Sequence, residues 1–456
     1  MHTLLTNPRH WSILTSILKK IEIRYYGRDS AFDRGPETRS QPRPPTLTQT
    51  KLQYHTTEPV REQQEVDRTQ REKQRHRHRP RFANMAQNLP PLPPWEQVST
   101  NVIRILGGNP SKFTLQGTNT YLLGRGERRL LIDTGQGEPA WVDTLRTVLQ
   151  AQSPPATVST CLLTHWHHDH IGGVKDLESL VENVRVYKNQ PTLNPDGLID
   201  PDRVIDITDG QRFKVSSREE SSDEQPDTDV DIDFEIEAIH TPGHAKDHMS
   251  FLVTKSSDPE EVGAIFTADN VLGHGTAVFE DLGVYLDSLA LMKKRVLEQS
   301  SRSGDDETGS ATSQKKAFPG HGAVISDSVA KIDEYIAHRR MREEEALNVL
   351  RFGTTTRPES KSLPHDSITR YGDSDDEQDG EAGGGNGSVT LGAKELTPGK
   401  EWTSMDMVRV IYRHYPENLY LPAEYGLVMV LEKLAKDGKV VKTPEGKWRA
   451  SEKAAL

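Results

Sequence analysis

The chain has 456 residues, a formal net charge of -11 and a mean hydropathy of -0.70, which allows two or three domains but indicates that some segments are too polar to join a core. Its single cysteine, Cys161, excludes an intrachain disulfide, and no run of 18 apolar residues offers a membrane span. This composition predicts a cytoplasmic protein with no membrane association.

The N-terminal 84 residues differ in charge from the rest of the chain. They hold 17 Lys and Arg against 9 Asp and Glu, which leaves 40 against 59 in residues 85–456. Residues 11–23 are compatible with a short amphipathic helix in basic surroundings, as in a mitochondrial presequence, and the alternative is an extension without function ahead of Met85. We expect residues 1–84 to be a disordered or targeting extension. The acidic remainder argues weakly against a polyanion as the main ligand.

Short β-rich runs separated by glycine-containing turns follow the extension. The predicted strands are residues 102–106, 120–123, 129–132, 159–163 and 264–266. A helix-compatible run at residues 139–150 lies between the third and fourth of these strands. Strands that alternate with helices predict a layered α/β domain.

Three polar segments interrupt this pattern. Residues 216–233 hold eight acids and one Arg, residues 301–316 are rich in Ser, Gly and Asp, and residues 353–400 contain DSDDEQDGEAGGGNG. Such segments bury too little apolar surface to offset the entropy of ordering them. We therefore expect a catalytic-type domain at 85–352 with insertions at 216–233 and 301–316, a linker at 353–400 and a separate unit at 401–456.

The C-terminal unit has the pattern of helices followed by a small hairpin. Thr403 and Asp406 suit a capping box at the start of a first helix, and a second helix is expected after Pro422 with Gly438 at its end. A strand at residues 439–443, a Pro-Glu-Gly turn and a second short run complete the unit. This order predicts a winged-helix-like module.

The chemically informative string is THWHHDHIGG at residues 164–173, directly after a predicted strand. His165 and His167 are separated by one residue, so an extended backbone can aim both imidazoles the same way. Asp169 and His170 lie past the bend and can face a neighbouring ion. This density of histidines and acids after a buried strand predicts a metal site.

Three further motifs place a ligand-type side chain at the end of an apolar run. They are HTPGH at residues 240–244, TAD at 267–269 and PGHG at 319–322. Asp133, in LIDTG, is expected to accept a hydrogen bond from a ligand imidazole and so fix its tautomer. His168 and His240 are expected to be structural.

The order HxHxDH, a later His, a later Asp and a final His resembles the metallo-β-lactamase superfamily in its glyoxalase II-type form. The resemblance implies a four-layer αββα sandwich, here followed by the winged-helix-like unit. It also implies two ion sites with one shared ligand: His165, His167 and His244 hold one ion, Asp169, His170 and His321 hold the second, and Asp269 bridges them.

Imidazole and carboxylate ligands without a thiolate favour Zn²⁺, although Mn²⁺ or Fe also suits such a site. A bridging water beside the ions would have its pKa lowered toward ~7, which makes hydroxide available at neutral pH. Asp169 is expected to be catalytic, because it can both ligate and transfer a proton. The sequence therefore predicts a hydrolase with two zinc ions per chain.

A narrower resemblance covers nearly all of residues 95–450. The runs GTNTYLLG, TPGHAKDHMSFL and IYRHYPENL look like the β-lactamase-like protein 2 family, and the three polar segments depart from it. That family implies either a single-strand-specific endoribonuclease or a fungal thioesterase that acts on a polyketide bound to an acyl carrier protein. The acidic core favours a thioester substrate. Single-stranded RNA as substrate, and a non-catalytic docking protein, are the alternatives.

Overall fold

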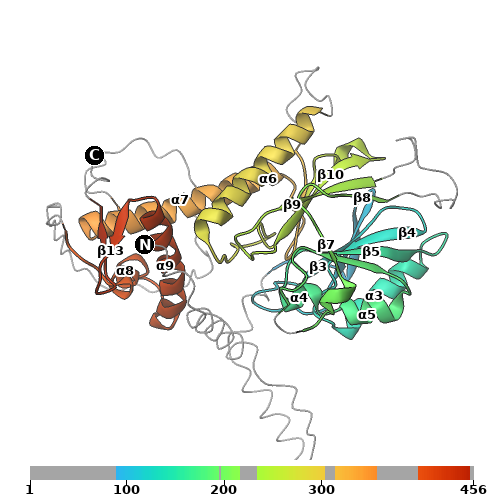
Figure 1. Cartoon of the computed structure of the whole chain (residues 1–456), viewed down its shortest axis with the longest axis horizontal. Helices are drawn as coiled ribbons and strands as arrows, with labels where there is room; N and C mark the ends of the chain where they lie inside the picture. Colours follow the sequence, from blue (N-terminus) through green and yellow to red (C-terminus); the bar gives the residue numbers. More distant parts are fainter. Residues whose placement is uncertain (1–88, 195–196, 216–233, 303–313, 357–398, 452–456) are drawn as a thin grey trace, which may run out of the picture. The chain divides into compact units, whose positions relative to one another are not determined.

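A computed structural model describes five stretches of the chain: residues 89–194, 197–215, 234–302, 314–356 and 399–451 (Figure 1). All five belong to one compact unit. The predicted extension at 1–84, the insertion at 216–233 and most of the segments 301–316 and 353–400 lie outside these residues. Within the described part, no helix is both long enough and apolar enough to cross a membrane.

Seven strands form the first sheet, in the order β1-β2-β3-β4-β5-β6-β7. Their bounds are β1 Trp95–Ser99, β2 Val102–Leu106, β3 Asn119–Leu123, β4 Arg128–Ile132, β5 Thr157–Leu163, β6 Arg185–Lys188 and β7 Ile205–Asp206. The pairs from β1 to β4 are antiparallel, and those from β4 to β7 are parallel. The sheet is therefore mixed: β1 to β4 form its antiparallel part, and β4 to β7 form its parallel part.

Five strands form the second sheet, in the order β12-β11-β10-β9-β8. Their bounds are β8 Arg212–Val215, β9 Phe234–His240, β10 Met249–Ser256, β11 Ile265–Ala268 and β12 Ala317–Pro319. Only β11 and β12 pair in parallel in this sheet. Because both β11 and β12 run the same way, the loops that follow them leave the sheet at the same edge.

Alternate side chains of the central strands belong to different cores. Tyr121 and Leu123 of β3 join a cluster with Phe251 of β10 and Phe266 of β11, whereas Leu122 belongs to a second cluster. Side chains alternate between the faces of a strand, so the shared cluster is the layer between the two sheets.

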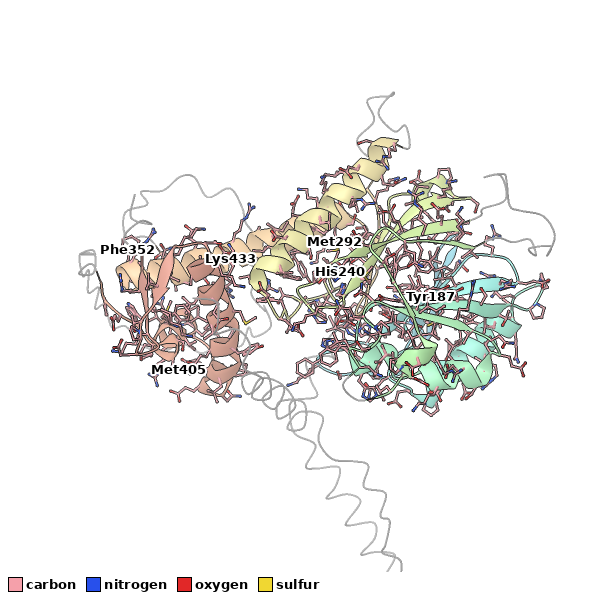
Figure 2. All side chains as sticks on the ribbon, viewed as in Figure 1. Tyr187, His240, Met292, Phe352, Met405 and Lys433 are labelled. Atoms are coloured by element: carbon pink, nitrogen blue, oxygen red, sulfur yellow. The ribbon has the colours of Figure 1, made fainter. Side chains whose placement is uncertain are left out.

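Helices cover the outer face of each sheet (Figure 1). Their bounds are α3 Pro139–Gln150, α4 His168–Ile171, α5 Val174–Leu180, α6 Leu282–Arg302, α7 Ser328–Phe352, α8 Ser404–Ile411 and α9 Tyr420–Lys436, with short 3-10 turns at η3 Pro201–Arg203, η5 Pro259–Glu261 and η6 Glu417–Leu419. Trp141 of α3 packs in the cluster of Leu122, and Met292 of α6 packs in the cluster of Leu252 (Figure 2). The predicted αββα sandwich is confirmed.

The C-terminal unit consists of α8, α9 and the hairpin β13 Val440–Lys442 with β14 Trp448–Ala450. Trp448 is 2% exposed in a cluster shared with α7, and Lys433 of α9 (Figure 2) forms an ion pair with Glu343 of α7 at 2.7 Å. The predicted cap is present, because the Thr403 hydroxyl accepts a hydrogen bond from the backbone N–H of Asp406 at 3.1 Å. The predicted winged-helix arrangement is confirmed.

Several elements differ from the prediction, which named five strands before the C-terminal unit and left β1, β6 to β10 and β12 unnamed. α9 begins at Tyr420 and includes Pro422, because proline is tolerated in the first turn of a helix. Strand β1 was not predicted, since it follows a proline-rich run that masks its start. Finally, Ser301 and Arg302, which we expected in a loop, complete α6.

Candidate metal centre

Five strands are each followed by a histidine or an aspartate at one edge of the sandwich. In the first sheet Asp133 follows β4, and His165 comes just after β5. In the second sheet His244, Asp269 and His321 come after β9, β11 and β12. The backbone joins the two edges, because Met249 at the start of β10 donates to the carbonyl of Thr164 at 2.8 Å.

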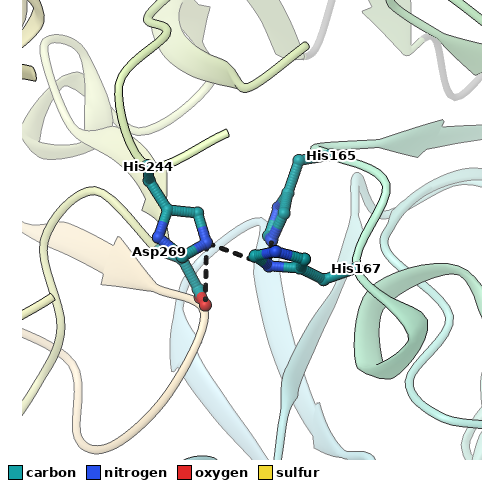
Figure 3. A group of neighbouring side chains, drawn as sticks. All are labelled: His165, His167, His244 and Asp269. Atoms are coloured by element: carbon teal, nitrogen blue, oxygen red, sulfur yellow. Dashed lines mark hydrogen bonds and ion pairs between the residues drawn. The ribbon is translucent and has the colours of Figure 1, made fainter. Parts of the chain in front are cut away.

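The first group of candidate ligands consists of His165, His167, His244 and Asp269, and Figure 3 shows their side chains converging. The Nδ1 atom of His167 lies 2.8 Å from Nε2 of His165 and 3.0 Å from Nε2 of His244. The Asp269 carboxylate lies 3.6 Å from Nε2 of His244. Three imidazole nitrogens and one carboxylate oxygen thus face a single point.

The second group consists of Asp169, His170 and His321. Nε2 of His321 lies 3.2 Å from the Asp169 carboxylate, and Nε2 of His170 lies 3.5 Å from it. Asp269 reaches this group as well, at 3.4 Å from Nε2 of His170 and 3.3 Å from Nε2 of His321. Asp269 therefore stands between the two groups with its two oxygens facing different partners.

Most of this cluster is removed from solvent. His165 and His170 are 0% exposed, whereas the Asp169 side chain is 23% exposed. Asp169 and His167 are the two partly exposed members of the cluster, so solvent reaches it at these two side chains.

Asp133 holds the ring of His170. Its carboxylate accepts hydrogen bonds from Nδ1 of His170 at 2.7 Å and from the backbone N–H of Thr164 at 2.8 Å. An imidazole that donates from Nδ1 keeps Nε2 available as a ligand atom. The predicted contact between Asp133 and a ring of the cluster is confirmed.

Similar contacts orient two rings of the first group. Nδ1 of His244 donates to the carbonyl of Val278 at 2.8 Å, and Nδ1 of His165 lies 2.9 Å from the hydroxyl of Thr164. Each contact leaves Nε2 pointing into the cluster, so these two rings are oriented before any ion binds.

Tight backbone packing places Asp269. A Cβ on Gly320 would lie 2.2 Å from Oδ1 of Asp269 and 3.0 Å from Cε1 of His170, so no larger residue fits there without displacing them. Ala268, the residue before Asp269, has φ +42°, a left-handed conformation that costs a non-glycine residue energy.

The charges of the cluster follow from burial and from the two carboxylates. Burial lowers the pKa of His167 to about 3 and also lowers the pKa of His165 and His244, so these rings are neutral. Burial would also lower the pKa of His321, but Asp269 and Asp169 outweigh it and raise that pKa to about 9. The part of the cluster around these carboxylates therefore attracts positive charge.

The residues fit a pair of cations. Nε2 of His170 and Oδ1 of Asp269 are buried without a hydrogen-bond partner, which is costly for polar atoms unless another group binds them. The neutral rings of the first group and the ionised carboxylates already have the protonation states that metal ligands need. His170 and His321, whose burial is outweighed by neighbouring carboxylates that raise their pKa values, would release a proton when a cation binds.

Several contacts at the site were not predicted. The Thr118 hydroxyl donates to the Asp169 carboxylate at 3.3 Å and accepts from the Asn109 amide at 3.0 Å. The buried Lys188 pairs with the buried Asp247, which joins the end of β6 to the loop that carries His244. A threonine or a lysine at a strand end gives no sequence signal of such roles.

The two histidines expected to be structural lie outside both groups. Nε2 of His240 lies 2.9 Å from the carbonyl of Lys246, and His168 begins α4. Neither belongs to the candidate ligand set, although both are adjacent to it in sequence.

Comparison with known proteins agrees with this geometry. Residues 113–258 match the metallo-beta-lactamase superfamily and residues 403–448 match the beta-lactamase associated winged helix domain. The chain is 43% identical to the lactamase-like protein adaB of Aspergillus niger, over 58% of this chain and 68% of that protein. It is 41% identical to the atrochrysone carboxyl ACP thioesterase of Aspergillus chevalieri, over 58% of this chain and 70% of that protein.

A second protein with that name, from Claviceps purpurea, is 38% identical over 64% of this chain and 78% of its own length. Among solved structures, a beta-lactamase domain protein from Burkholderia ambifaria matches with a TM-score of 0.52 at 15% identity, over 80% of this chain and 96% of that one. The chain has two β-sheets between helical layers, with histidines and aspartates at one edge, and it is 43% and 41% identical to two of these relatives over more than two thirds of their lengths. The chain therefore belongs to the metallo-β-lactamase superfamily.

Proposed function

We propose that this protein is a zinc-dependent thioesterase that hydrolyses an acyl-thioester, such as a polyketide acyl group on an acyl carrier protein. The observation that supports this most strongly is the coincidence of two facts. All seven histidines and aspartates of the predicted set lie at one edge of the sandwich. Two relatives, of whose lengths the match with this chain covers 70% and 78%, are named as ACP thioesterases.

The proposed ligand sets follow the two groups. His165, His167 and His244 would hold one Zn²⁺, Asp169, His170 and His321 the other, and Asp269 would contact both. Two bound ions would lower the pKa of a coordinated water and polarise the thioester carbonyl. The donor set of imidazoles and carboxylates without a thiolate supports zinc.

Asp169 is the proposed proton-transfer residue. It is the most exposed carboxylate of the cluster, and its pKa is held below the usual range because the charges of His170 and His321 outweigh its burial. An ionised carboxylate at the opening can take the proton of the attacking water and pass it to the leaving sulfur. In the overall reaction the acyl C–S bond breaks, a C–O bond to the water oxygen forms, and the thiol receives the proton.

The domain division remains part of the proposal. The two family matches fall inside the proposed domains at 85–352 and 401–456, which supports a catalytic domain followed by a winged-helix module. The C-terminal residues 401–456 hold nine Lys and Arg against eight Asp and Glu. This near-balance is not the excess of basic residues that typically accompanies RNA binding, so the endoribonuclease alternative has less support.

A turnover panel on the purified full chain tests the proposal. The substrates are an acyl-thioester of N-acetylcysteamine, a single-stranded oligonucleotide of RNA and a chromogenic β-lactam, each assayed with zinc and after chelation. We expect zinc-dependent turnover of the thioester at a rate well above the other two. Cleavage of RNA alone would replace the proposal with the endoribonuclease, and no turnover of any substrate would favour a docking protein.

A further inference from the structure

Arg339, in the middle of α7, is a buried cation outside both candidate ligand groups. It is 8% exposed, and a charged side chain removed from water is costly unless its N–H groups find partners. Its Nη2 atom donates to the carbonyl of Ala277 at 2.6 Å. The guanidinium also lies 4.8 Å from the centre of the Phe279 ring, within the range of a cation–π contact. Both contacts direct Arg339 to the segment 277–280.

This segment carries the hydrogen-bond acceptor that orients His244. The carbonyl of Val278 accepts the Nδ1–H of His244 at 2.8 Å, and Val278 follows Ala277 directly. Because a peptide unit is planar, the hydrogen bond from Arg339 fixes the plane that joins Ala277 to Val278. The contact of Arg339 is therefore one residue away from the carbonyl that holds the ring.

Val278 cannot hold this carbonyl by its own side chain. That side chain is 68% exposed, so it gains little from packing. The segment is anchored on either side of it instead. Arg339 holds one side, and on the other the backbone N–H of Glu280 donates to the carbonyl of Gly243 at 2.6 Å. Loss of the contact of Arg339 would leave one of these two anchors, and the carbonyl would then be less restrained.

The aromatic rings beside Arg339 extend its contacts toward Asp269. Phe279 stacks on Tyr285 with ring centres 5.5 Å apart, and the guanidinium lies 5.7 Å from the centre of the Tyr285 ring. The Tyr285 hydroxyl donates to the carbonyl of Asn270, the residue after Asp269, at 2.5 Å. Arg339 thus packs on rings that contact the backbone beside a second candidate ligand.

The helix that presents Arg339 is itself held by the C-terminal module. Glu343 lies one turn after Arg339, and its carboxylate pairs with Lys433 of α9 at 2.7 Å. Further along α7, Val349 shares a core with Trp448 of the hairpin. The position of Arg339 therefore depends on the packing of α7 as well as on its own contacts.

We propose that Arg339 is a positioning residue for the first group of ligands. By holding the carbonyl of Ala277 it sets the direction of the next carbonyl, which keeps Nδ1 of His244 hydrogen-bonded and Nε2 available to a cation. The inference rests on the proposed zinc centre. It gives α7 a part in metal binding, although neither candidate ligand group contains a residue of this helix.

Three substitutions on α7 test the inference. Arg339→Met removes the N–H groups and the charge but keeps an unbranched side chain that can still pack on the two rings. Arg339→Lys keeps the charge and an ammonium that can donate to one carbonyl. Arg340→Met is the matched control, because Arg340 is the next residue of the same helix and is exposed.

The first measurement is the zinc affinity of metal-free protein, by competition with a chromogenic chelator, in the native chain and in His244→Ala. The first site is the one whose affinity His244→Ala lowers. We expect Arg339→Met to weaken zinc binding there by about 10–100-fold, Arg339→Lys to weaken it less, and Arg340→Met to leave it unchanged. In the His244→Ala background, Arg339→Met should change the affinity by less than about twofold, because the ring through which Arg339 acts is gone.

The second measurement is hydrogen exchange of the Glu280 amide in the metal-free protein. Because this N–H is the other anchor of the segment, its exchange reports how firmly the segment is held. We expect exchange about tenfold faster in Arg339→Met, the size expected for the loss of one hydrogen bond, and no change in Arg340→Met.

Unchanged zinc affinity in Arg339→Met would overturn the inference. An equal loss of affinity in the native and His244→Ala backgrounds would also overturn it, because Arg339 would then act on the whole fold. If the melting temperature shows that metal-free Arg339→Met is unfolded, Arg339→Lys takes its place in the same comparison of backgrounds and the same outcomes decide. A native chain that binds zinc but hydrolyses no thioester would instead overturn the proposed function and leave the role of Arg339 standing.

Discussion

The two sheets supply the metal centre in different ways. The first sheet contributes four candidate ligands from one continuous stretch, His165 to His170, whereas the second contributes His244, Asp269 and His321 from three separate turns. The spacing of the first set within one loop fixes the positions of its four side chains relative to one another. The second set depends on the packing of β9, β11 and β12, so a defect in the second sheet should damage the site without touching the recognisable motif.

The largest expected effect comes from Asp269→Asn. Asp269 lies within 3.6 Å of His244 in the first group and of His170 and His321 in the second, so the change removes a charge that both proposed ion sites would share. We expect thioesterase activity to fall to background and the bound zinc to fall for both sites. Elemental analysis and turnover on the same preparation check this. Retention of both ions with normal turnover would show that Asp269 does not bridge.

Asp169→Asn should follow in size. The change keeps the shape and one possible ligand oxygen, but it removes the carboxylate that we propose takes and returns the proton. We expect kcat to fall by roughly 10²–10⁴, with little change in melting temperature. The measurement is kcat, metal content and melting temperature together. Near-normal kcat with both ions bound would assign the proton transfer to another group.

Gly320→Ala tests the second sheet without removing any ligand. Its Cβ would lie 2.2 Å from Oδ1 of Asp269, so this carboxylate must move. A displacement of about 1 Å at a reacting centre costs roughly 100-fold in rate, and we expect a loss of that order. Gly426→Ala in α9 is the control, because nothing lies within 4 Å of its Cβ. Equal activity of the two variants would contradict the close packing around Asp269.

Asp133→Asn should have the smallest effect of the four. The amide keeps one acceptor oxygen for Thr164 but contacts Nδ1 of His170 less favourably than the carboxylate does. Residues that orient a metal ligand contribute about 10–100-fold to metal affinity or activity. Zinc titration of the metal-free variant measures the affinity. An unchanged zinc affinity would show that Asp133 does not orient the ring.

The comparison also explains how much the sequence could predict. Four ligand candidates were visible because HxHxDH lies in one short run after an apolar strand. Asp133 could also be recognised, because it is a charged residue directly after an apolar strand. For the second sheet, the residues themselves could be named, but their grouping came from a resemblance to a family.

Other parts depend on tertiary structure alone. The carbonyl of Val278 holds the ring of His244, and backbone carbonyls carry no side-chain signal. Thr118 contacts Asp169 across 51 positions of sequence, a distance no local pattern encodes. We also expected α9 to begin after Pro422, although it begins at Tyr420 and holds this proline in its first turn.

The most direct test of the account is metal stoichiometry paired with activity in the full-length native chain. We expect about two zinc ions per chain by elemental analysis, loss of thioester hydrolysis when a chelator removes them, and recovery when zinc is restored to the same level. Full thioester hydrolysis by a preparation that holds far less than two metal ions per chain would contradict the proposed two-ion centre.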